Sequence, residues 1–369
     1  MLKQLFNVGI QAVLGANCVA AAINARPILK PVHVLAIGKA AVSMFDGLRK
    51  TDTEIETALL ITKHGHADRV TFNPHVEIIE SAHPEPDQSS LIAGQKALDW
   101  VKSRPQSSTL LFLVSGGASA LAEVLIDGIT LDQLSTMTKN ALTSGLAIGD
   151  INQRRMEMSA IKGGKLLANF PGKRATVLYI SDVEGDHIGI VGSGIGACPL
   201  PPNFEYECQL VASNEIARNE IAKAAKNMGL EVIENADLLF DDVEILAPRL
   251  AQRVLEGQNG LYIWGGESTV KLPPNPGLGG RNQCLGLMFA KEIAGHSGIT
   301  GLFAGTDGTD GPTINAGALV NGKTFTAQPG AQAALEAANS GAYLQACKVI
   351  FRTGPTGTNV MDLALIHKE

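Results

Sequence analysis

Residues 109–119 read Thr109-Leu110-Leu111-Phe112-Leu113-Val114-Ser115-Gly116-Gly117-Ala118-Ser119, an unbroken apolar run that passes directly into a glycine-rich loop. A short apolar run bounded by such a loop is typical of a strand buried on both faces. Similar runs predict further strands at Val32–Ile37, Ala58–Thr62, Val76–Glu80 and Thr176–Ser181. Helical patterns separate them, at Leu2–Asn24, Ser89–Val101 and Leu131–Ala147. This alternation predicts an α/β fold whose parallel sheet is covered by helices on both faces.

A second series of strands and helices follows a change in composition. Gly192–Asn203 is rich in glycine and proline, and new strands are expected at Leu210–Ala212, Glu231–Ile233 and Leu261–Trp264. Helices are expected at Asn214–Met228 and Val243–Glu256, the latter with Pro248 delaying its start or kinking it. Because 369 residues exceed one small core, we expect two domains, residues 1–205 and 206–369.

The composition excludes several classes of protein. Hydrophobic residues make up 45% of the chain and charged residues 18%, which is typical of a globular protein and not of a disordered one. The net charge of −6 and the lack of a basic patch argue against a nucleic-acid partner. No window approaches the roughly 20 apolar residues of a membrane span, so no membrane association is expected. Five scattered cysteines favour reduced thiols, hence a cytoplasmic location and no zinc site.

Two loops that follow expected strands have the features of anion sites. Gly38 and Lys39 open a helix, where backbone N–H groups and a lysine could hold phosphate, although an exposed structural lysine is an equal alternative. The spacing fits neither a P-loop nor the Gly-x-Gly-x-x-Gly dinucleotide fingerprint. Ser115-Gly116-Gly117-Ala118-Ser119 could cradle phosphates in the same way. A nucleophilic serine is the competing interpretation, but the Gly-x-Ser-x-Gly elbow is missing.

Carboxylates in other loops suit Mg²⁺ or a proton-abstracting base. Asp182 follows the strand Thr176–Ser181, where open α/β sheets gather their ligands. Asp307 and Asp310 lie three residues apart in the segment Gly305–Pro312, which is too glycine-rich for a helix. The alternatives are an Asx turn or helix cap at Asp182 and a surface turn at the pair.

An arginine stands where the helix dipole disfavours it. Arg281 follows Gly279 and Gly280 and opens an expected helix that runs to about Ile293. That local conflict points to function, because an arginine fork suits a carboxylate or a transferring phosphoryl group. The loop Gly265-Gly266-Glu267-Ser268-Thr269 adds another carboxylate.

Ordered motifs over more than 300 residues give the chain a resemblance to the type II glycerate 2-kinases, which carry the MOFRL domain. Besides the loops already quoted, they are Ser159-Ala160-Ile161-Lys162-Gly163-Gly164-Lys165-Leu166, Gly280-Arg281-Asn282-Gln283 and Thr353-Gly354-Pro355-Thr356-Gly357-Thr358-Asn359-Val360. The resemblance implies a Rossmann-like N-terminal domain, a smaller α/β C-terminal MOFRL domain and a site in the cleft. It also implies phosphorylation of D-glycerate at the 2-hydroxyl by ATP with Mg²⁺.

The resemblance also assigns the candidate residues. The lysine and arginine regarded as essential in the family fall on Lys39 and Arg281, and we place Asp182 and Asp307 beside them as catalytic candidates. The candidates for nucleotide binding are Gly38, Ser115, Gly116, Gly117, Ser119, Lys162, Asn282 and Asn359. The candidates for Mg²⁺ are Asp182, Glu267, Asp307 and Asp310.

The chain departs from the family pattern at four places, which puts the acceptor in question. Ala118 replaces a glycine, Glu184 replaces a proline, Ile195 interrupts a Ser-Gly-Pro-Thr segment, and Asn315 replaces an aspartate. Three alternatives stay open: a kinase of another small hydroxy acid, an NAD(P)H-dependent hydroxypyruvate reductase, and a metabolite-binding protein without activity. The missing dinucleotide fingerprint counts against the reductase. A homodimer is also open.

Overall fold

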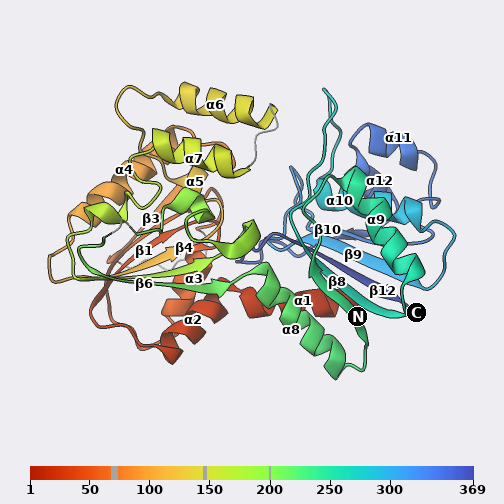
Figure 1. Ribbon diagram of the computed structural model, residues 1–369, viewed down its shortest axis with the longest axis horizontal. Helices are drawn as coiled ribbons and strands as arrows, with labels where there is room; N and C mark the ends of the chain where they lie inside the picture. The colour runs from red at the N-terminus through yellow and green to blue at the C-terminus, as the bar shows by residue number, and fades with distance from the viewer. Residues whose placement is uncertain (68–73, 144–147, 199–200) are drawn as a thin grey trace. The chain divides into compact units, whose positions relative to one another are not determined.

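The computed structural model of the chain describes residues 1–67, 74–143, 148–198 and 201–369, which form two compact units (Figure 1). The parallel-sheet unit comprises Leu14–Ser213 with Gly357–Asn359. The mixed-sheet unit comprises Met1–Val13, Asn214–Thr356 and Val360–Glu369. Each unit has its own sheet and its own hydrophobic core.

The parallel-sheet unit confirms the predicted parallel α/β architecture. Its strands are β1 (Val32–Ile37), β2 (Ile55–Lys63), β3 (Val76–Ser81), β4 (Thr109–Val114), β5 (Arg174–Ile180) and β6 (Glu205–Ala212). They pair in the order β3-β2-β1-β4-β5-β6, every neighbour parallel, which is the strand order of a Rossmann-like sheet. The two central strands are buried along almost their whole length, which is why their sequences are unbroken apolar runs.

Helices cover both faces of this sheet, with α2 and α3 on one side and α4, α5 and α7 on the other (Figure 1). The helices are α2 (Gly15–Ala25), α3 (Ala41–Leu48), α4 (Gln88–Lys102), α5 (Ala118–Leu121), α6 (Leu131–Thr143) and α7 (Ile148–Met158). Short 3₁₀ turns lie at Leu167–Asn169, Glu184–Asp186 and Val191–Gly194. The predicted helix end at Ala147 lies outside the described residues.

The mixed-sheet unit is built on a six-stranded sheet in the order β11-β10-β9-β12-β8-β7. Its strands are β7 (Val232–Asp237), β8 (Gly260–Gly266), β9 (Ile299–Gly305), β10 (Gly317–Asn321), β11 (Ile350–Phe351) and β12 (Asp362–Lys368). Only the β7–β8 pair is parallel. The C-terminal strand β12 is inserted between β8 and β9, so its first residue lies at the edge where both of those strands end.

The helices of this unit are α1 (Leu2–Val13), α8 (Asn214–Asn227), α9 (Val243–Glu256), α10 (Arg281–Glu292), α11 (Ala331–Glu336) and α12 (Ser340–Ala346). Helix α9 starts at Val243 with an Asp242 side-chain cap, so the delayed start suggested by Pro248 is not seen. The single helix predicted over Leu2–Asn24 is instead two, divided at Leu14. Helix α2 begins at Gly15, where a Cβ would stand 2.9 Å from the backbone nitrogen of Met44.

Helix α1 packs with the C-terminal half of the chain, although the sequence-based division placed it in domain 1–205. The Phe6 ring meets the Phe351 ring edge-on at 5.2 Å between centroids. Gly9 lets Ile221 of α8 approach, since a Cβ there would stand 2.6 Å from that side chain. An apolar helix face takes the tertiary partner that buries it, whatever its place in the sequence. The division 1–205 and 206–369 stays a prediction.

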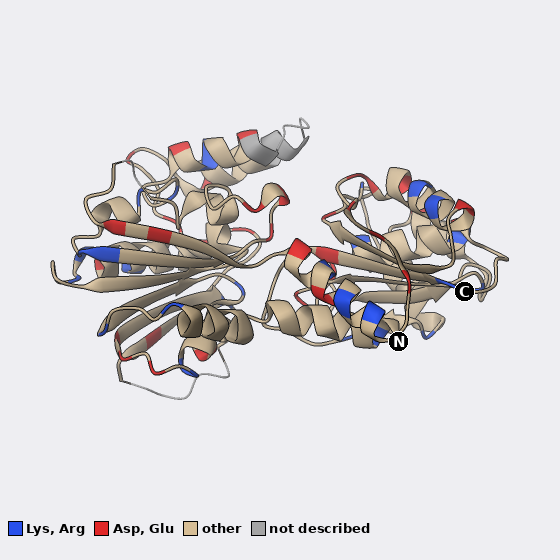
Figure 2. Cartoon of the chain, turned by 60° about the horizontal axis from the view of Figure 1, so that its bottom comes forward, with Lys and Arg blue, Asp and Glu red and all other residues tan. Residues whose placement is uncertain are grey.

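Most strand segments are tan in Figure 2, but some strands carry charged residues, such as Glu77 and Glu80 within β3. Lys and Arg alternate with Asp and Glu and form no single block in this view. Within the described ranges, no single helix is long and apolar enough to cross a membrane. Helices α1 and α2 reach that length and apolar composition only when they are taken together, and they are bent by 44°.

Candidate active site

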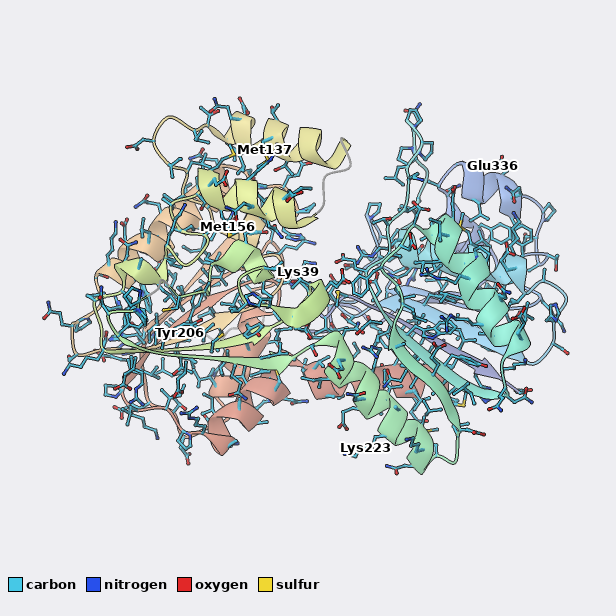
Figure 3. The ribbon with its side chains drawn as sticks, in the orientation of Figure 1. Lys39, Met137, Met156, Tyr206, Lys223 and Glu336 are labelled. Atoms are coloured by element: carbon cyan, nitrogen blue, oxygen red, sulfur yellow. The ribbon has the colours of Figure 1, made fainter. Side chains whose placement is uncertain are left out.

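The site residues of the parallel-sheet unit gather where its strand order reverses. Strands β1 and β4 are neighbours, yet the chain goes from β1 outward to β2 and β3 before it returns to β4. The loops after β1 and β4 therefore diverge and leave a crevice beyond the carboxyl ends of the strands, the usual ligand position in such sheets. Lys39 stands in the first loop, at this edge (Figure 3).

The two loops are locked together by hydrogen bonds. The backbone N–H of Lys39 donates to the carbonyl of Gly116 at 2.9 Å, and the N–H of Ala40 donates to Ser115 Oγ at 3.1 Å. Gly38 has a φ of 139°, and a Cβ there would stand 2.1 Å from Ser115 Oγ. Only glycine permits this approach. The backbone of Lys39 is thus fixed while its side chain remains partly exposed.

Asp182 joins these loops from the next strand, β5. Its Oδ2 accepts a hydrogen bond from Asn359 Nδ2 at 2.9 Å. A Cβ on Gly116 would stand 1.9 Å from the same oxygen, so the loop backbone passes directly against the carboxylate. Gly117, with a φ of 84°, fits between the side chains of His83 and Lys39. The structure thus brings together Gly38, Lys39, Ser115, Gly116, Gly117, Asp182 and Asn359.

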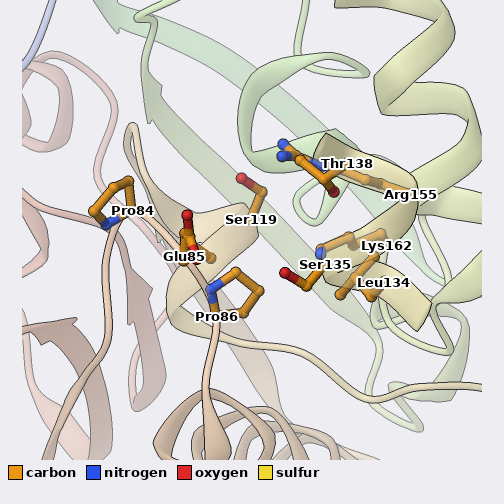
Figure 4. A pocket seen from close by; sticks show the side chains of 10 residues that line it. Pro84, Glu85, Pro86, Ser119, Leu134, Ser135, Thr138, Arg155 and Lys162 are labelled. Atoms are coloured by element: carbon orange, nitrogen blue, oxygen red, sulfur yellow. The ribbon is translucent and has the colours of Figure 1, made fainter. Parts of the chain in front are cut away.

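Ser119 and Lys162 lie in a neighbouring pocket of about 250 Å³ (Figure 4). Its wall includes Pro84 and Pro86 from one loop, hydroxyl side chains from α5 and α6, and Arg155 from α7. Lys162 is only 1% exposed and forms an ion pair with the fully buried Glu123. Glu123 also accepts a hydrogen bond from Ser159 Oγ at 2.5 Å.

Electrostatics in this pocket are governed by burial. Burial lowers the pKa of Lys162, and the charge of Glu123 opposes that shift. Burial also lowers the pKa of the Arg155 guanidinium, again against the charge of Glu123. Each cation is therefore stabilised by the same buried carboxylate, which cannot balance both.

In the mixed-sheet unit, three carboxylates meet at one edge of the sheet. Glu267 follows the end of β8 and Asp307 follows the end of β9. Asp362, the first residue of β12, is paired in register with the last residue of each strand, Gly266 and Gly305. The antiparallel insertion of β12 therefore adds a carboxylate that the two loops alone would not supply.

Arg281 is held between two of these carboxylates. Its Nε donates to Asp362 Oδ2 at 2.6 Å and its Nη2 to Asp362 Oδ1 at 3.1 Å, a bidentate pair. Its Nη1 lies 2.6 Å from Glu267 Oε1. Burial alone would lower the pKa of Arg281, but the charges of Asp362 and Glu267 outweigh burial and raise it. Asp362 is 1% exposed and Glu267 45%, so the Nη1 side is the one that faces solvent.

Asp310 caps the helix that Arg281 opens. Its Oδ1 accepts from Asn282 N at 3.0 Å and Asn282 Nδ2 at 3.3 Å, and its Oδ2 accepts from Gln283 N at 2.8 Å and Gln283 Nε2 at 2.9 Å. A carboxylate at a helix N-terminus also meets a favourable dipole. The four bonds describe a structural cap formed from a distant loop. Metal binding by Asp310 and cofactor binding by Asn282 stay predictions.

Asp307 forms a local Asx turn, and a surface turn was the alternative interpretation of its loop. Its Oδ1 accepts from Thr309 N at 2.9 Å and Thr309 Oγ1 at 2.8 Å, which leaves Oδ2 outside this turn. Among the described residues, no group of three or more His, Cys, Asp or Glu is arranged to hold a metal. The assignments of Asp182, Glu267 and Asp307 to Mg²⁺ therefore stay predictions.

Three residues with evident roles were missed from the sequence: Asp362, Glu123 and Arg155. Asp362 carried a signal, because a lone carboxylate interrupts the apolar run Val360–Ile366. Glu123 carried none, since its burial depends on the partner Lys162, 39 residues away. Arg155 stands next to Arg154 in a polar helix, and only the pocket distinguishes the two.

Two family models match this chain. The domain of unknown function DUF4147 matches residues 1–228, and the MOFRL family matches residues 260–362. A protein of Thermotoga maritima named D-glycerate 2-kinase is 32% identical, over 91% of this chain and 90% of its own length. A protein of Agrobacterium vitis whose name refers to a hydroxypyruvate reductase is 29% identical, over 99% of this chain and 93% of its own length.

The fold has a counterpart of known structure. The crystal structure of a glycerate kinase from Thermotoga maritima covers 99% of this chain and 98% of its own chain. The TM-score is 0.84 at 28% sequence identity, so the likeness extends over both units.

Proposed function

The chain belongs to the glycerate 2-kinase family, with its DUF4147 and MOFRL regions, and on that premise we propose that it phosphorylates D-glycerate. The γ-phosphoryl group of ATP passes to the 2-hydroxyl, and the products are ADP and 2-phosphoglycerate. The observation that carries the proposal is the interlocked pair of loops at the reversal of strand order, with Lys39 fixed above Ser115 and Gly116.

These loops suit the phosphate groups of ATP. The glycine-rich backbone between β4 and α5 offers N–H groups at a turn, and the Lys39 ammonium adds a positive charge beside them. Phosphoryl transfer needs positioning and charge stabilisation more than covalent help from the protein. Donors that are already fixed before the reaction are the efficient form of such help.

Carboxylates of both units suit Mg²⁺, which when bound neutralises charge on the phosphate oxygens. Asp182, Glu267 and Asp307 offer hard oxygen ligands, and each is at least partly exposed. Each of the three is a candidate to hold the metal ion or to accept the proton of the attacking hydroxyl. Asp310 is less suited to either role, because both its oxygens are occupied by hydrogen bonds.

Arg281 stabilises the transferring group. Asp362 fixes the Nε and Nη2 side of the guanidinium, while Nη1 reaches the more exposed Glu267. A phosphoryl oxygen can replace Glu267 there without disturbing the bidentate pair.

The proposal places the enzyme in the cytoplasm, as its dispersed cysteines favour, and leaves a homodimer open. A coupled assay of ADP release tests the activity across D-glycerate, L-glycerate, glycolate and lactate, each with Mg²⁺ and with a chelator. We expect Mg²⁺-dependent release with D-glycerate above the others. Oxidation of NADH with hydroxypyruvate is measured beside it. NADH oxidation without ADP release from any acid would favour the reductase instead.

A further inference from the structure

The pocket beside the phosphate loop holds two cations that share one buried carboxylate among the described residues. Arg155 and Lys162 both line it, and one fully buried carboxylate, Glu123, is paired with Lys162. The only acidic side chain among the described lining residues, Glu85, is exposed. Because Glu123 is paired with Lys162, a ligand that supplies negative charge would stabilise the partly buried Arg155 further.

The Arg155 guanidinium is itself without a hydrogen bond to any residue that the structure describes. A guanidinium has five N–H donors in a planar fork, and this shape matches the two oxygens of a carboxylate. Arg281 cannot offer the same fork, because three of its nitrogens already face Asp362 and Glu267. The position suited to a carboxylate is therefore in the parallel-sheet unit.

The size and wall of the pocket suit a small hydroxy acid. At about 250 Å³ it lies below the roughly 300–1,000 Å³ usual for drug-sized ligands, which suits a molecule smaller than a whole nucleotide. Hydroxyl groups of Ser119, Ser135 and Thr138 lie around it, as Figure 4 shows. They can bond the hydroxyl groups of a polyol acid.

Ser119 also ties the pocket to the reacting group. It is the second residue of α5, which starts directly after the loop Ser115–Gly117. A ligand in the pocket is thus next to a phosphate held by that loop. We propose that this pocket is the acceptor site and that Arg155 binds the carboxylate of the acid, an inference that rests on the kinase function proposed above.

The test is a kinetic comparison of two adjacent arginines in the full-length protein. Arg155→Gln removes the charge and the fork, and Arg154→Gln is the matched control, since Arg154 is exposed and does not line the pocket. Loss of a charge-assisted hydrogen bond predicts a rise of about ten- to a hundredfold in KM for D-glycerate, with KM for ATP unchanged. Arg155→Lys should fall between, and Arg154→Gln should match the wild type.

Specificity gives a second readout. Glycerol has the same carbon skeleton without the carboxylate, so the preference of the wild type for D-glycerate over glycerol should shrink about tenfold or more in Arg155→Gln. An unchanged KM for D-glycerate, or a rise in KM for ATP alone, would overturn the acceptor site while leaving the kinase function standing.

Direct binding separates the two proposals, because it requires no turnover. Calorimetry of the wild-type protein with D-glycerate alone should show binding that weakens in Arg155→Lys, whether or not ADP is ever released. A crystal soaked with D-glycerate should show the carboxylate on Arg155. A carboxylate found on Arg281 instead would refute the inference.

Discussion

Replacement of Asp310 by alanine should lower the stability of the mixed-sheet unit and leave its Mg²⁺ requirement unchanged. In the native protein the carboxylate accepts four hydrogen bonds at the start of α10, two of them from the backbone N–H groups of Asn282 and Gln283. Alanine leaves both backbone donors buried without acceptors. The side-chain amides of Asn282 and Gln283 can turn to other partners. The two backbone N–H donors therefore set the size of the stability loss.

The expected loss follows from those two donors. Each orphaned buried donor costs about 1–3 kcal/mol, so the free energy of unfolding should fall by roughly 4 kcal/mol. At about 2–4 °C per kcal/mol for a unit of this size, the midpoint should drop by roughly 8–16 °C. Asp307→Ala is the control, because its carboxylate is partly exposed and accepts from Thr309 in a local turn. It should cost about 1 kcal/mol.

The assay is thermal unfolding by calorimetry, followed by the Mg²⁺ concentration that gives half-maximal activity. If Asp310 is a helix cap, its loss lowers the melting midpoint. The Mg²⁺ concentration for half-maximal activity then stays unchanged in the enzyme that is still folded. The reasoning is refuted if Asp310→Ala melts within about 2 °C of the wild type while its Mg²⁺ requirement rises. That pattern belongs to a metal ligand.

The same residue predicts a pH dependence. Burial raises the pKa of Asp310 to about 6 from 3.8, against the hydrogen bonds that lower it. Between these values the folded protein binds a proton that the unfolded chain releases. Stability due to this group is therefore present below about pH 4 and lost as the pH rises through 6. Asp310→Asn should remove this slope from the unfolding free energy measured between pH 4 and 7.

Three further substitutions probe the rest of the site. Lys39→Ala should lower kcat by about 10²–10³-fold with an unchanged melting temperature, and near-wild-type turnover would make Lys39 a structural residue. Asp362→Ala removes the bidentate partner of Arg281 and should lower both stability, by about 2–4 kcal/mol, and kcat; a change in neither would show that the pair is dispensable. Glu123→Gln breaks a buried ion pair and should cost about 3–5 kcal/mol, whereas the double change with Lys162→Met should recover much of it; additive losses would contradict that coupling.

Periodicity and loop chemistry were enough to predict the parallel-sheet unit. The run Thr109–Val114 is β4 residue for residue, because a strand buried on both faces must be apolar throughout. Arg281 was predicted to open a helix, and α10 begins there. Its conflict with the helix dipole is resolved by Asp362, 81 residues away in sequence. That contact depends on the insertion of β12 between β8 and β9, which no local pattern encodes.

The prediction of a single helix over Leu2–Asn24 was wrong, because the local pattern does not encode tertiary partners. The break at Leu14 arises because α1 and α2 pack against different partners, and the local pattern of an alanine-rich helix continues through it. Asp310 was predicted as a metal ligand because a glycine-rich loop with two carboxylates suits a metal as well as a turn, and that assignment stays a prediction. Only the position of α10 shows that its oxygens face a helix end.

The product formed from ATP and D-glycerate tests the central claim most directly. Phosphorus and proton nuclear magnetic resonance of the reaction mixture reports which carbon carries the new phosphate. The account predicts Mg²⁺-dependent ADP formation and a phosphorus signal coupled to the single proton on carbon 2. A signal coupled to the two protons on carbon 3, or no phosphorylated acid at all while hydroxypyruvate consumes NADH, would contradict it.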